Sequence, residues 1–200
     1  FANLDKHIEN VRRYGVPVIV AINHFPTDAD EEIEHVQAHC ARLGVPCALS
    51  MVFAEGGEGG RELAQTVMEV LRTQGSEFRF LYDVDIPIRD KIRKIATEIY
   101  GADDVQYVGT AVRDIRAIEL AGGEHLPICM AKTQMSLSDD PRLKGAPRGW
   151  TLTVREVLLS AGARFIVPLC GNIMLIPGLP SRPAAEHIDY TDEGRIIGLS

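Results

Sequence analysis

Short apolar runs alternate with amphipathic segments over the first 73 residues. The run Val16–Ile22 is rich in β-branched residues, which is typical of a buried strand, and Pro46–Ser50 predicts a second strand. Apolar residues at helical spacing predict three helices, over residues 3–14, 28–43 and 61–72. Helices that alternate with strands indicate an α/β fold, namely a parallel, Rossmann-like sheet with crossover helices.

The remainder of the chain predicts a second α/β unit with a small β-rich C-terminal tail. The predicted helices span residues 87–100 and 111–120; the predicted strands span residues 105–108, 128–131, 151–158, 165–169 and 188–190, with a last one near 196–197. A long polar stretch, residues 132–149, has no periodicity and is a candidate functional loop. We expect one unit over residues 1–73 and another over 77–200, with the tail from about residue 150.

Charge and hydropathy exclude several classes of protein. The 200 residues include 21 Lys and Arg against 28 Asp and Glu, which gives a net charge of −7. An acidic chain disfavours a broad nucleic-acid or anionic-membrane surface, but it leaves room for a small basic pocket that binds an anion. The apolar runs are too short to span a bilayer, so we expect no membrane segment.

Cysteine and histidine spacing points away from a metal centre. The four cysteines show no zinc spacing and lie in apolar surroundings, so we expect buried free thiols and a reducing cytoplasm; they are Cys40, Cys47, Cys129 and Cys170. His35 and His39 stand four residues apart on a predicted helix, where two ligands could meet a metal. No third ligand is evident nearby, which favours a solvated or half-buried helix face.

Two aromatic residues follow the two predicted strands of the first unit. Phe25 comes just after the first strand, and Phe53 comes just after the second. Because the carboxyl ends of parallel strands meet at one edge of a sheet, both rings are expected at the same crevice. Two rings across a crevice would suit a flat heteroaromatic ligand. The alternative is that both rings simply cover the core at the strand ends.

Three further segments are candidates for chemistry. The glycine-rich loop Met51–Gly60 could bring backbone amides to an anion, but it lacks the pattern of a Walker A loop and carries acidic residues. Lys132, at the start of the long polar stretch, is a possible anion or loop site. Adjacent Asp139 and Asp140 could bind a cation, although a capping or salt-bridge role is favoured. No catalytic triad or catalytic residue is indicated.

Many short segments, taken in order, resemble the C-terminal part of formate–tetrahydrofolate ligases over essentially the whole chain. They begin with the N-terminal helix and the segment Ala21–Asp28, and they continue through Gly56–Gly60 and Ala131–Gln134. Further matches are Lys91-Ile92, Ile99–Asp103, Ser138–Asp140, Pro177–Pro180 and Pro183–Ala185. The ending Gly198–Ser200 resembles the C-terminus of that family.

The resemblance implies an ATP-dependent ligase that makes 10-formyltetrahydrofolate through formyl phosphate. It implies Mg²⁺ with the ATP, a monovalent cation, and a homo-oligomer in the cytoplasm. The folate ring would stack between Phe25 and Phe53, and Pro26 and Leu49 match other positions of the pocket wall. The family commonly has Trp where this chain has Phe53, so weaker folate affinity is expected.

The family's ATP- and formate-binding part has no counterpart in these residues. The N-terminal helix begins at once and the first residue is Phe1, so we expect the chain to be a piece whose partner is that N-terminal part, inactive by itself. One alternative is a non-catalytic oligomerisation or structural module. A GTPase-like switch is a second alternative, since Asn23 and Asp28 resemble residues that read guanine. His24 stands where such proteins have Lys, and the spacing of the other two residues is too long.

Overall fold

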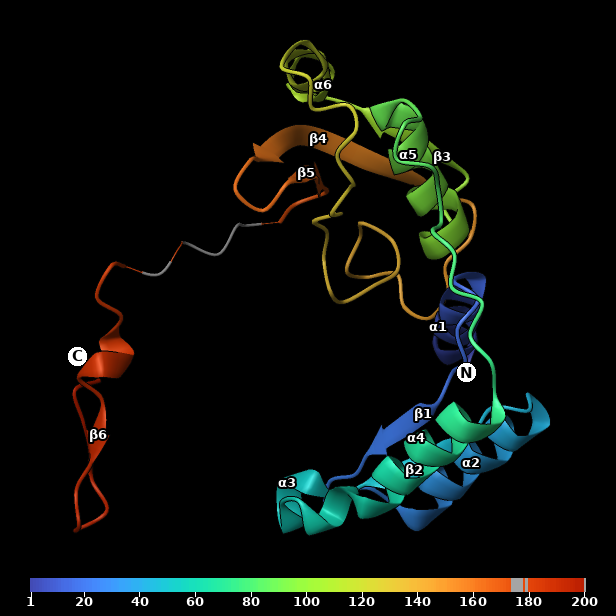
Figure 1. Ribbon diagram of the computed structural model, residues 1–200, viewed down its shortest axis with the longest axis vertical. Coiled ribbons are helices and arrows are strands. Elements are labelled where there is room, and N and C mark those ends of the chain that lie inside the picture. Colours follow the sequence, from blue (N-terminus) through green and yellow to red (C-terminus); the bar gives the residue numbers. More distant parts are fainter. Residues whose placement is uncertain (174–177, 179, 200) are drawn as a thin grey trace.

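The computed structural model describes residues 1–173, 178 and 180–199 (Figure 1). The segment Pro177–Pro180, one of those that carry the family resemblance, therefore lies partly outside the described residues. In the first unit, β1 (Val20–Asn23) and β2 (Cys47–Ser50) form a two-stranded parallel sheet. The α/β fold class is thus confirmed, although β1 is shorter than the apolar run that predicted it.

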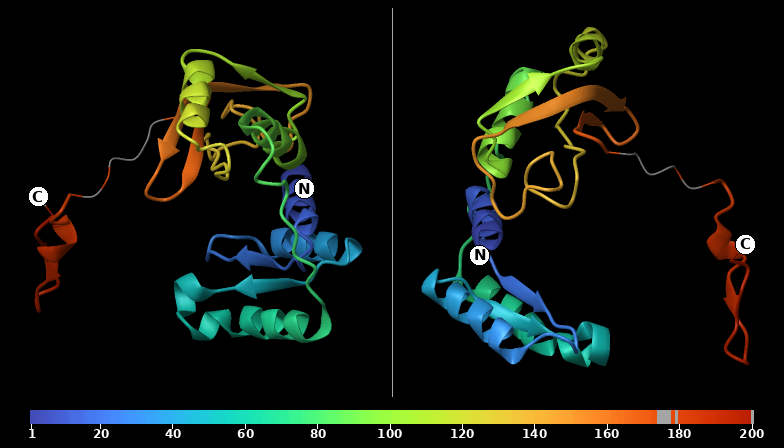
Figure 2. Two further views of the ribbon diagram at one scale, coloured as in Figure 1. Left: turned by 45° about the horizontal axis from the view of Figure 1, so that its top comes forward. Right: turned by 180° about the vertical axis from the view of Figure 1, so that it is seen from behind.

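Helices pack beside these two strands. The first unit contains α1 (Ala2–Arg13), α2 (Asp30–Arg42), α3 (Val52–Glu55), the 3-10 turn η1 (Glu58–Gly60) and α4 (Arg61–Thr73). Figure 2 shows α2 and α4 beside the strands, with α3 at the end toward which the strands point. Both α2 and α4 contact β2. The three long helices were predicted, whereas α3 and η1 lie where a glycine-rich loop was expected.

The second unit is built around a mixed sheet in the order β3-β4-β5. Its elements are α5 (Ile88–Lys94), the π-helix η2 (Ile95–Tyr100), β3 (Asp104–Tyr107), α6 (Ala111–Leu120), β4 (Thr151–Ser160) and β5 (Phe165–Cys170). β4 pairs parallel with β3 and antiparallel with β5, and α6 contacts β4. The tail holds η3 (Ala184–Glu186) and a hairpin of β6 (Asp189–Tyr190) and β7 (Ile196–Ile197), as expected for a β-rich end.

The predicted strand over residues 128–131 is wrong. Only Ile128 and Ala131 form isolated parallel bridges, to Ile166 and Leu169 of β5. Segment 128–131 is apolar because it packs into the core of the second unit: Ile128 is buried there, and Met130 packs against that core. The long stretch 132–149 contains no helix or strand, as predicted.

Two separate apolar clusters lie on either side of the connecting residues 74–80. One contains Ile8, Cys40 and Val45 together with partly buried neighbours up to Cys47. The other draws its members from residues 81–170 and centres on buried isoleucines of α5 and α6 and valines of β4. Each cluster excludes water from one sheet, which is the main contribution to folding. The division into units 1–73 and 77–200 stays a prediction, because these clusters do not show how either unit folds alone.

Helix α1 connects the two units through polar side chains. The Asn10 amide Nδ2 donates to the Ile99 carbonyl at 2.9 Å, and Lys6 Nζ donates to the Glu98 carbonyl at 2.8 Å. Arg13 adds an ion pair with the Glu98 carboxylate at 3.0 Å. Carbonyl groups in the last turn of a helix lack partners within that helix, so these two donors from α1 complete the end of η2.

Candidate functional site

The two predicted aromatic residues meet at the carboxyl ends of β1 and β2. The ring centroids of Phe25 and Phe53 are 5.5 Å apart, and the ring planes are inclined by 51°. Phe25 is 41% exposed and Phe53 is 73% exposed. Such large exposed fractions show that neither ring plugs the core, which was the alternative interpretation. The pair is therefore an accessible aromatic surface where a parallel sheet offers a ligand crevice.

A short turn fixes the position of Phe25. The His24 amide donates to the Ser50 carbonyl at 3.0 Å, which extends the pairing of the two strands by one residue. The Phe25 amide donates to the Asp28 carboxylate at 2.8 Å, and the Asp28 amide donates back to the Phe25 carbonyl at 2.9 Å. Asp28 consequently holds this turn, and the N-cap of α2 is Ala29, with no side-chain capping hydrogen bond.

A close backbone contact fixes the position of Phe53. The Met51 amide donates to the Gly59 carbonyl at 2.9 Å, so the segment after α3 folds back onto its start. A Cβ on Gly59 would lie only 2.5 Å from the Met51 carbonyl oxygen. A side chain at this position is thus excluded, and the glycine-rich sequence serves to pack the turn that carries Phe53.

The two other predicted pocket positions lie on the same elements. Pro26 follows Phe25 in the turn and is exposed. Leu49 lies on β2 opposite Ile22 of β1 and is half-buried. Both flank the strand ends from which the aromatic rings arise, so the structure brings all four predicted folate positions to one edge of the sheet.

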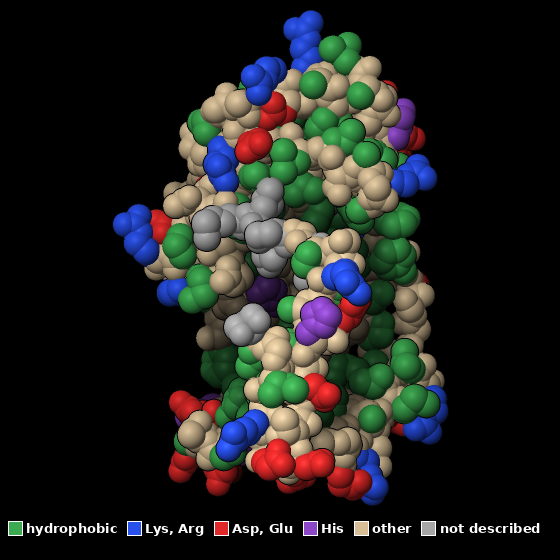
Figure 3. Space-filling view, turned by 90° about the vertical axis from the view of Figure 1, so that its left-hand side faces the viewer, with side chains coloured by type: hydrophobic (Ala, Val, Ile, Leu, Met, Phe, Trp, Pro, Cys, Tyr) green, Lys and Arg blue, Asp and Glu red, His purple; other side chains and the backbone are tan. Residues whose placement is uncertain are grey.

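The surroundings of the aromatic pair are acidic. Asp28, Glu55 and Glu58 lie on the turns that carry the two rings, and Arg61 forms an ion pair with Glu58 at 2.8 Å. Figure 3 shows Asp and Glu side chains gathered at the lower end of the molecule. Carboxylates repel phosphate groups, so the glycine-rich turn does not fit a nucleotide phosphate. Among the described residues no group of three His, Cys, Asp or Glu is placed to hold a metal ion.

Lys132 is anchored within the long loop of the second unit. Its Nζ donates to the Thr133 carbonyl at 2.8 Å and to the Ser136 carbonyl, and it lies 4.9 Å from the centroid of the Tyr100 ring. Burial lowers the pKa of Lys132 below its usual range. These contacts support the loop-anchoring interpretation more directly than anion binding.

The adjacent aspartates take structural roles, as favoured from the sequence. Asp139 accepts a hydrogen bond from the Thr153 amide at 2.8 Å. Asp140 accepts bonds from the backbone and side chain of Arg142, which lower the pKa of Asp140 to about 2. The loop is therefore held by side-chain contacts in the absence of regular secondary structure.

The expectation of buried thiols is only partly correct. Cys40 and Cys170 are buried and Cys47 is half-buried, but Cys129 is exposed; all four are free. The sequence neighbours of Cys129 are apolar, yet the irregular segment 128–131 turns this side chain outward.

His39 pairs with Asp5 at 2.5 Å and stacks on Phe1, which agrees with the half-buried helix face expected for His35 and His39.

One residue beside the aromatic pair, His24, was not predicted from the sequence as a site residue. His24 is half-buried between β1 and Phe25, and its Nδ1 is buried without a hydrogen-bond partner among the described residues. Its place directly after a strand end was the signal available in the sequence. His24 is the titratable group nearest in sequence to Phe25 on that turn.

These features define an α/β protein with an accessible aromatic pair at the carboxyl ends of parallel strands. The comparison with protein families identifies it further: the chain belongs to the formate–tetrahydrofolate ligase family, whose model matches residues 1–200. In the part of the chain that the structure describes, no helix is both long enough and apolar enough to cross a membrane.

Proposed function

We propose that this chain supplies the folate-binding side of a ligase that joins formate to tetrahydrofolate at the expense of ATP. The observation that carries the proposal is the exposed pair Phe25–Phe53 at the carboxyl edge of the first sheet, in a chain of this family. The pteridine ring of tetrahydrofolate is flat and heteroaromatic, so stacking against phenyl rings would contribute roughly 0.5–1.5 kcal/mol per contact beyond burial.

We propose an order of events that follows the chemistry implied by the family resemblance. ATP and formate give formyl phosphate, and N10 of tetrahydrofolate then attacks the formyl carbon with release of phosphate. The residues described here would hold the folate ring at Phe25 and Phe53, with Pro26 and Leu49 on the pocket wall. Their role is to orient the attacking nitrogen, because correct placement of two reactants lowers the entropic part of the barrier.

The phosphate and metal chemistry lies outside these residues. Transfer of a phosphoryl group requires donors directed at its oxygens, whereas the glycine-rich turn here is packed on Met51 and lined by Glu55 and Glu58. We propose that ATP, Mg²⁺, the monovalent cation and formate are held by an N-terminal part of the same enzyme. The 200-residue chain alone is then inactive, and the complete enzyme works in the cytoplasm as a homo-oligomer.

An equilibrium titration of the purified chain with tetrahydrofolate tests the folate site. Saturable binding that Phe25→Ala reduces at least tenfold would support it. Phe80→Ala serves as the matched control, because Phe80 is 79% exposed and contacts Phe78 rather than this site. GTP is the control ligand for the GTPase-like alternative. No saturable folate binding by a folded chain would contradict the proposal and favour a structural module.

An assay for 10-formyltetrahydrofolate tests the division of labour. The chain is mixed with ATP, Mg²⁺, K⁺, formate and tetrahydrofolate, and product is measured by its absorbance after conversion in acid. We expect no product above a blank without protein. ATP-dependent product from the pure chain would show that the residues described here include a phosphoryl-transfer site.

A further inference from the structure

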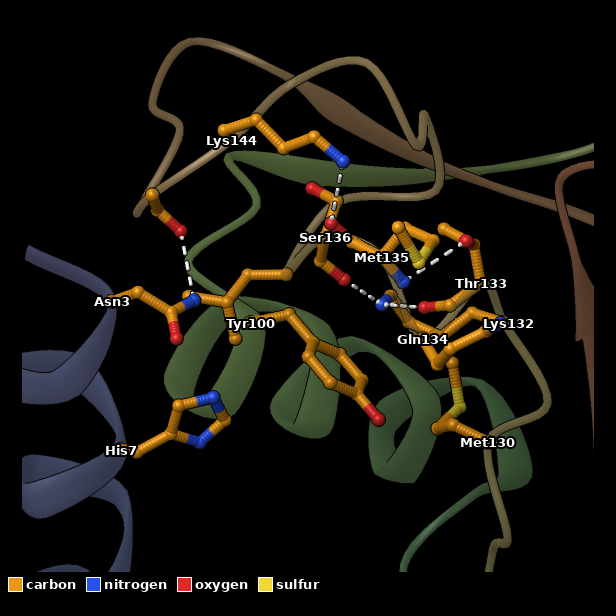
Figure 4. Close-up of a pocket in the computed structure, with 12 residues that line it drawn as sticks. Asn3, His7, Tyr100, Met130, Lys132, Thr133, Gln134, Met135, Ser136 and Lys144 are labelled. Atoms are coloured by element: carbon orange, nitrogen blue, oxygen red, sulfur yellow. Dashed lines mark hydrogen bonds between the residues drawn. The ribbon is translucent and has the colours of Figure 1, made fainter. Parts of the chain in front are cut away.

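A second pocket lies between α1, the end of η2 and the long loop, apart from the aromatic pair. It encloses about 530 Å³, a volume suited to a small organic ligand. Figure 4 shows Tyr100 directed into the space between His7 on one side and the loop residues Gln134 and Lys144 on the other. The side chains come from three segments that are distant in the sequence, so the pocket exists only in the folded chain.

The charge of this pocket is opposite to that of the protein. The chain carries a net charge of −7, yet the described lining residues include Lys132, Lys144 and His7 and no carboxylate. Lys144 Nζ makes one long hydrogen bond, 3.3 Å to the Met135 carbonyl, and so retains donors for a ligand. A pocket with two ammonium groups and no acid favours an anion.

The remaining wall of the pocket is apolar and aromatic. Tyr100 presents its ring, and Met130, Met135 and Leu137 contribute thioether and aliphatic surface. Methionine side chains adapt to the shape of a ring, and their sulfur atoms contact aromatic groups favourably. The Lys132 side chain is held in this wall, because its ammonium donates hydrogen bonds to loop carbonyls and lies over the Tyr100 ring.

The loop that forms this wall is held in place before any ligand arrives. Asn3 Nδ2 donates to the Gly145 carbonyl at 3.0 Å, which fastens the loop to α1. The Ser136 hydroxyl donates to the Leu143 carbonyl and closes the loop on itself. A pre-formed pocket loses less conformational entropy on binding than one that must fold around its ligand.

From this geometry we propose a binding site for a small organic anion that consists of a flat ring and a phosphate or carboxylate group. The ring packs against Tyr100 and the two methionines, and the anionic group is bound by Lys144, with the His7 ring at the opposite rim. The site is distinct from the Phe25–Phe53 pair, and its existence does not depend on the folate proposal.

Methyl NMR of the chain labelled with ¹³C-methyl methionine provides the test. Adenosine 5′-monophosphate and 4-aminobenzoyl-glutamate are titrated separately, as a ring with phosphate and a ring with carboxylates; adenosine is the uncharged control. We expect saturable shifts at Met130 and Met135 with at least one anion and none at Met68, which lies on α4 outside the pocket. Adenosine should bind at least fivefold more weakly than its monophosphate.

Two variants separate the charge of the pocket from the charge of the whole chain. Lys144→Gln should weaken binding of the anion at least fivefold, whereas Arg116→Gln removes one charge from the exposed surface of α6 and should have no effect. Circular dichroism confirms that both variants are folded, and Gln134→Ala provides a second pocket variant. Equal effects of the two charge changes, shifts outside the pocket methionines, or equal binding of adenosine and its monophosphate would overturn the proposal. The proposal would also be overturned if neither anion caused chemical-shift changes at concentrations up to 10 mM, which is about ten times a Kd of about 1 mM.

Discussion

The rings of Phe25 and Phe53 contact each other directly, with 5.5 Å between their centroids. A flat ligand sandwiched between two rings needs about 7 Å, because stacked carbon atoms approach to about 3.5 Å on each face. One ring must therefore move before a pteridine can enter between them. Phe53 is the freer of the two, since it is 73% exposed and lies on the four-residue helix α3.

Replacing Phe53 by the larger indole should strengthen folate binding. In Phe53→Trp the wider ring adds contact area on the exposed side of the pair, and a two- to tenfold lower Kd for tetrahydrofolate is expected, which corresponds to roughly 0.4–1.4 kcal/mol. Fluorescence or calorimetric titration measures the difference. Phe78→Trp, at an exposed ring in the connecting segment, is the control and should leave the Kd unchanged. Equal or weaker binding by Phe53→Trp would show that ring area does not limit affinity.

Gly59 and Gly57 offer a matched pair for the turn that carries Phe53. Gly59→Ala places a Cβ about 2.5 Å from the Met51 carbonyl oxygen, so either the turn or α3 must shift. We expect a loss of about 1–3 kcal/mol in the free energy of unfolding. Gly57→Ala has open space and a helical φ of −60°, and should be neutral or slightly stabilising. Urea unfolding of both variants makes the comparison; identical stabilities would contradict the packing role of Gly59.

Substitution of Lys91 tests how much a buried ammonium contributes to the stability of the second unit. Lys91 has no exposed surface, and its Nζ donates to the Leu126 carbonyl at 3.1 Å and to the Glu124 carbonyl. Lys91→Met keeps most of the volume but leaves two carbonyls without a donor, so we expect a loss of about 2–4 kcal/mol. Lys94→Met, at an exposed lysine that pairs with Glu98 at 3.6 Å, should cost less than about 0.5 kcal/mol. Chemical unfolding monitored at the single Trp150 distinguishes the two.

The pKa values of two half-buried tyrosines predict how the stability of the folded chain changes at high pH. Burial raises the pKa of Tyr100 to about 12, and burial likewise raises the pKa of Tyr107 to about 12. A raised pKa means that the protonated form is favoured in the folded chain. The resulting stability is present below pH 10, the usual tyrosine value, and is lost as the pH rises from about 10 to 12.

Absorbance at 295 nm measures this ionisation. At pH 11 the folded chain should show a smaller tyrosinate signal than the chain in guanidinium chloride, and Tyr100→Phe or Tyr107→Phe should leave the folded signal at pH 11 nearly unchanged. Full ionisation of the folded chain at pH 11, with native circular dichroism, would contradict the burial of these hydroxyl groups.

The sequence by itself determined the local elements and the placement of the Phe25–Phe53 pair. Helical periodicity fixed α1, α2, α4 and α6 to within a few residues, because an amphipathic stripe identifies the face that must be buried. Aromatic residues after two short strands predicted the Phe25–Phe53 pair, since parallel strands end at a common edge. These predictions depend on neighbours in the chain, for which spacing alone carries the information.

Only the tertiary structure decided the features that join distant segments. The strand expected at 128–131 became two bridges, because pairing with β5 depends on where the second core places that segment. The Asp28 carboxylate accepts a hydrogen bond from the Phe25 amide, and α2 begins without a side-chain cap. The basic pocket of Lys144, Tyr100 and His7 has no pattern in the sequence, since residues 7, 100 and 144 meet only through three-dimensional packing.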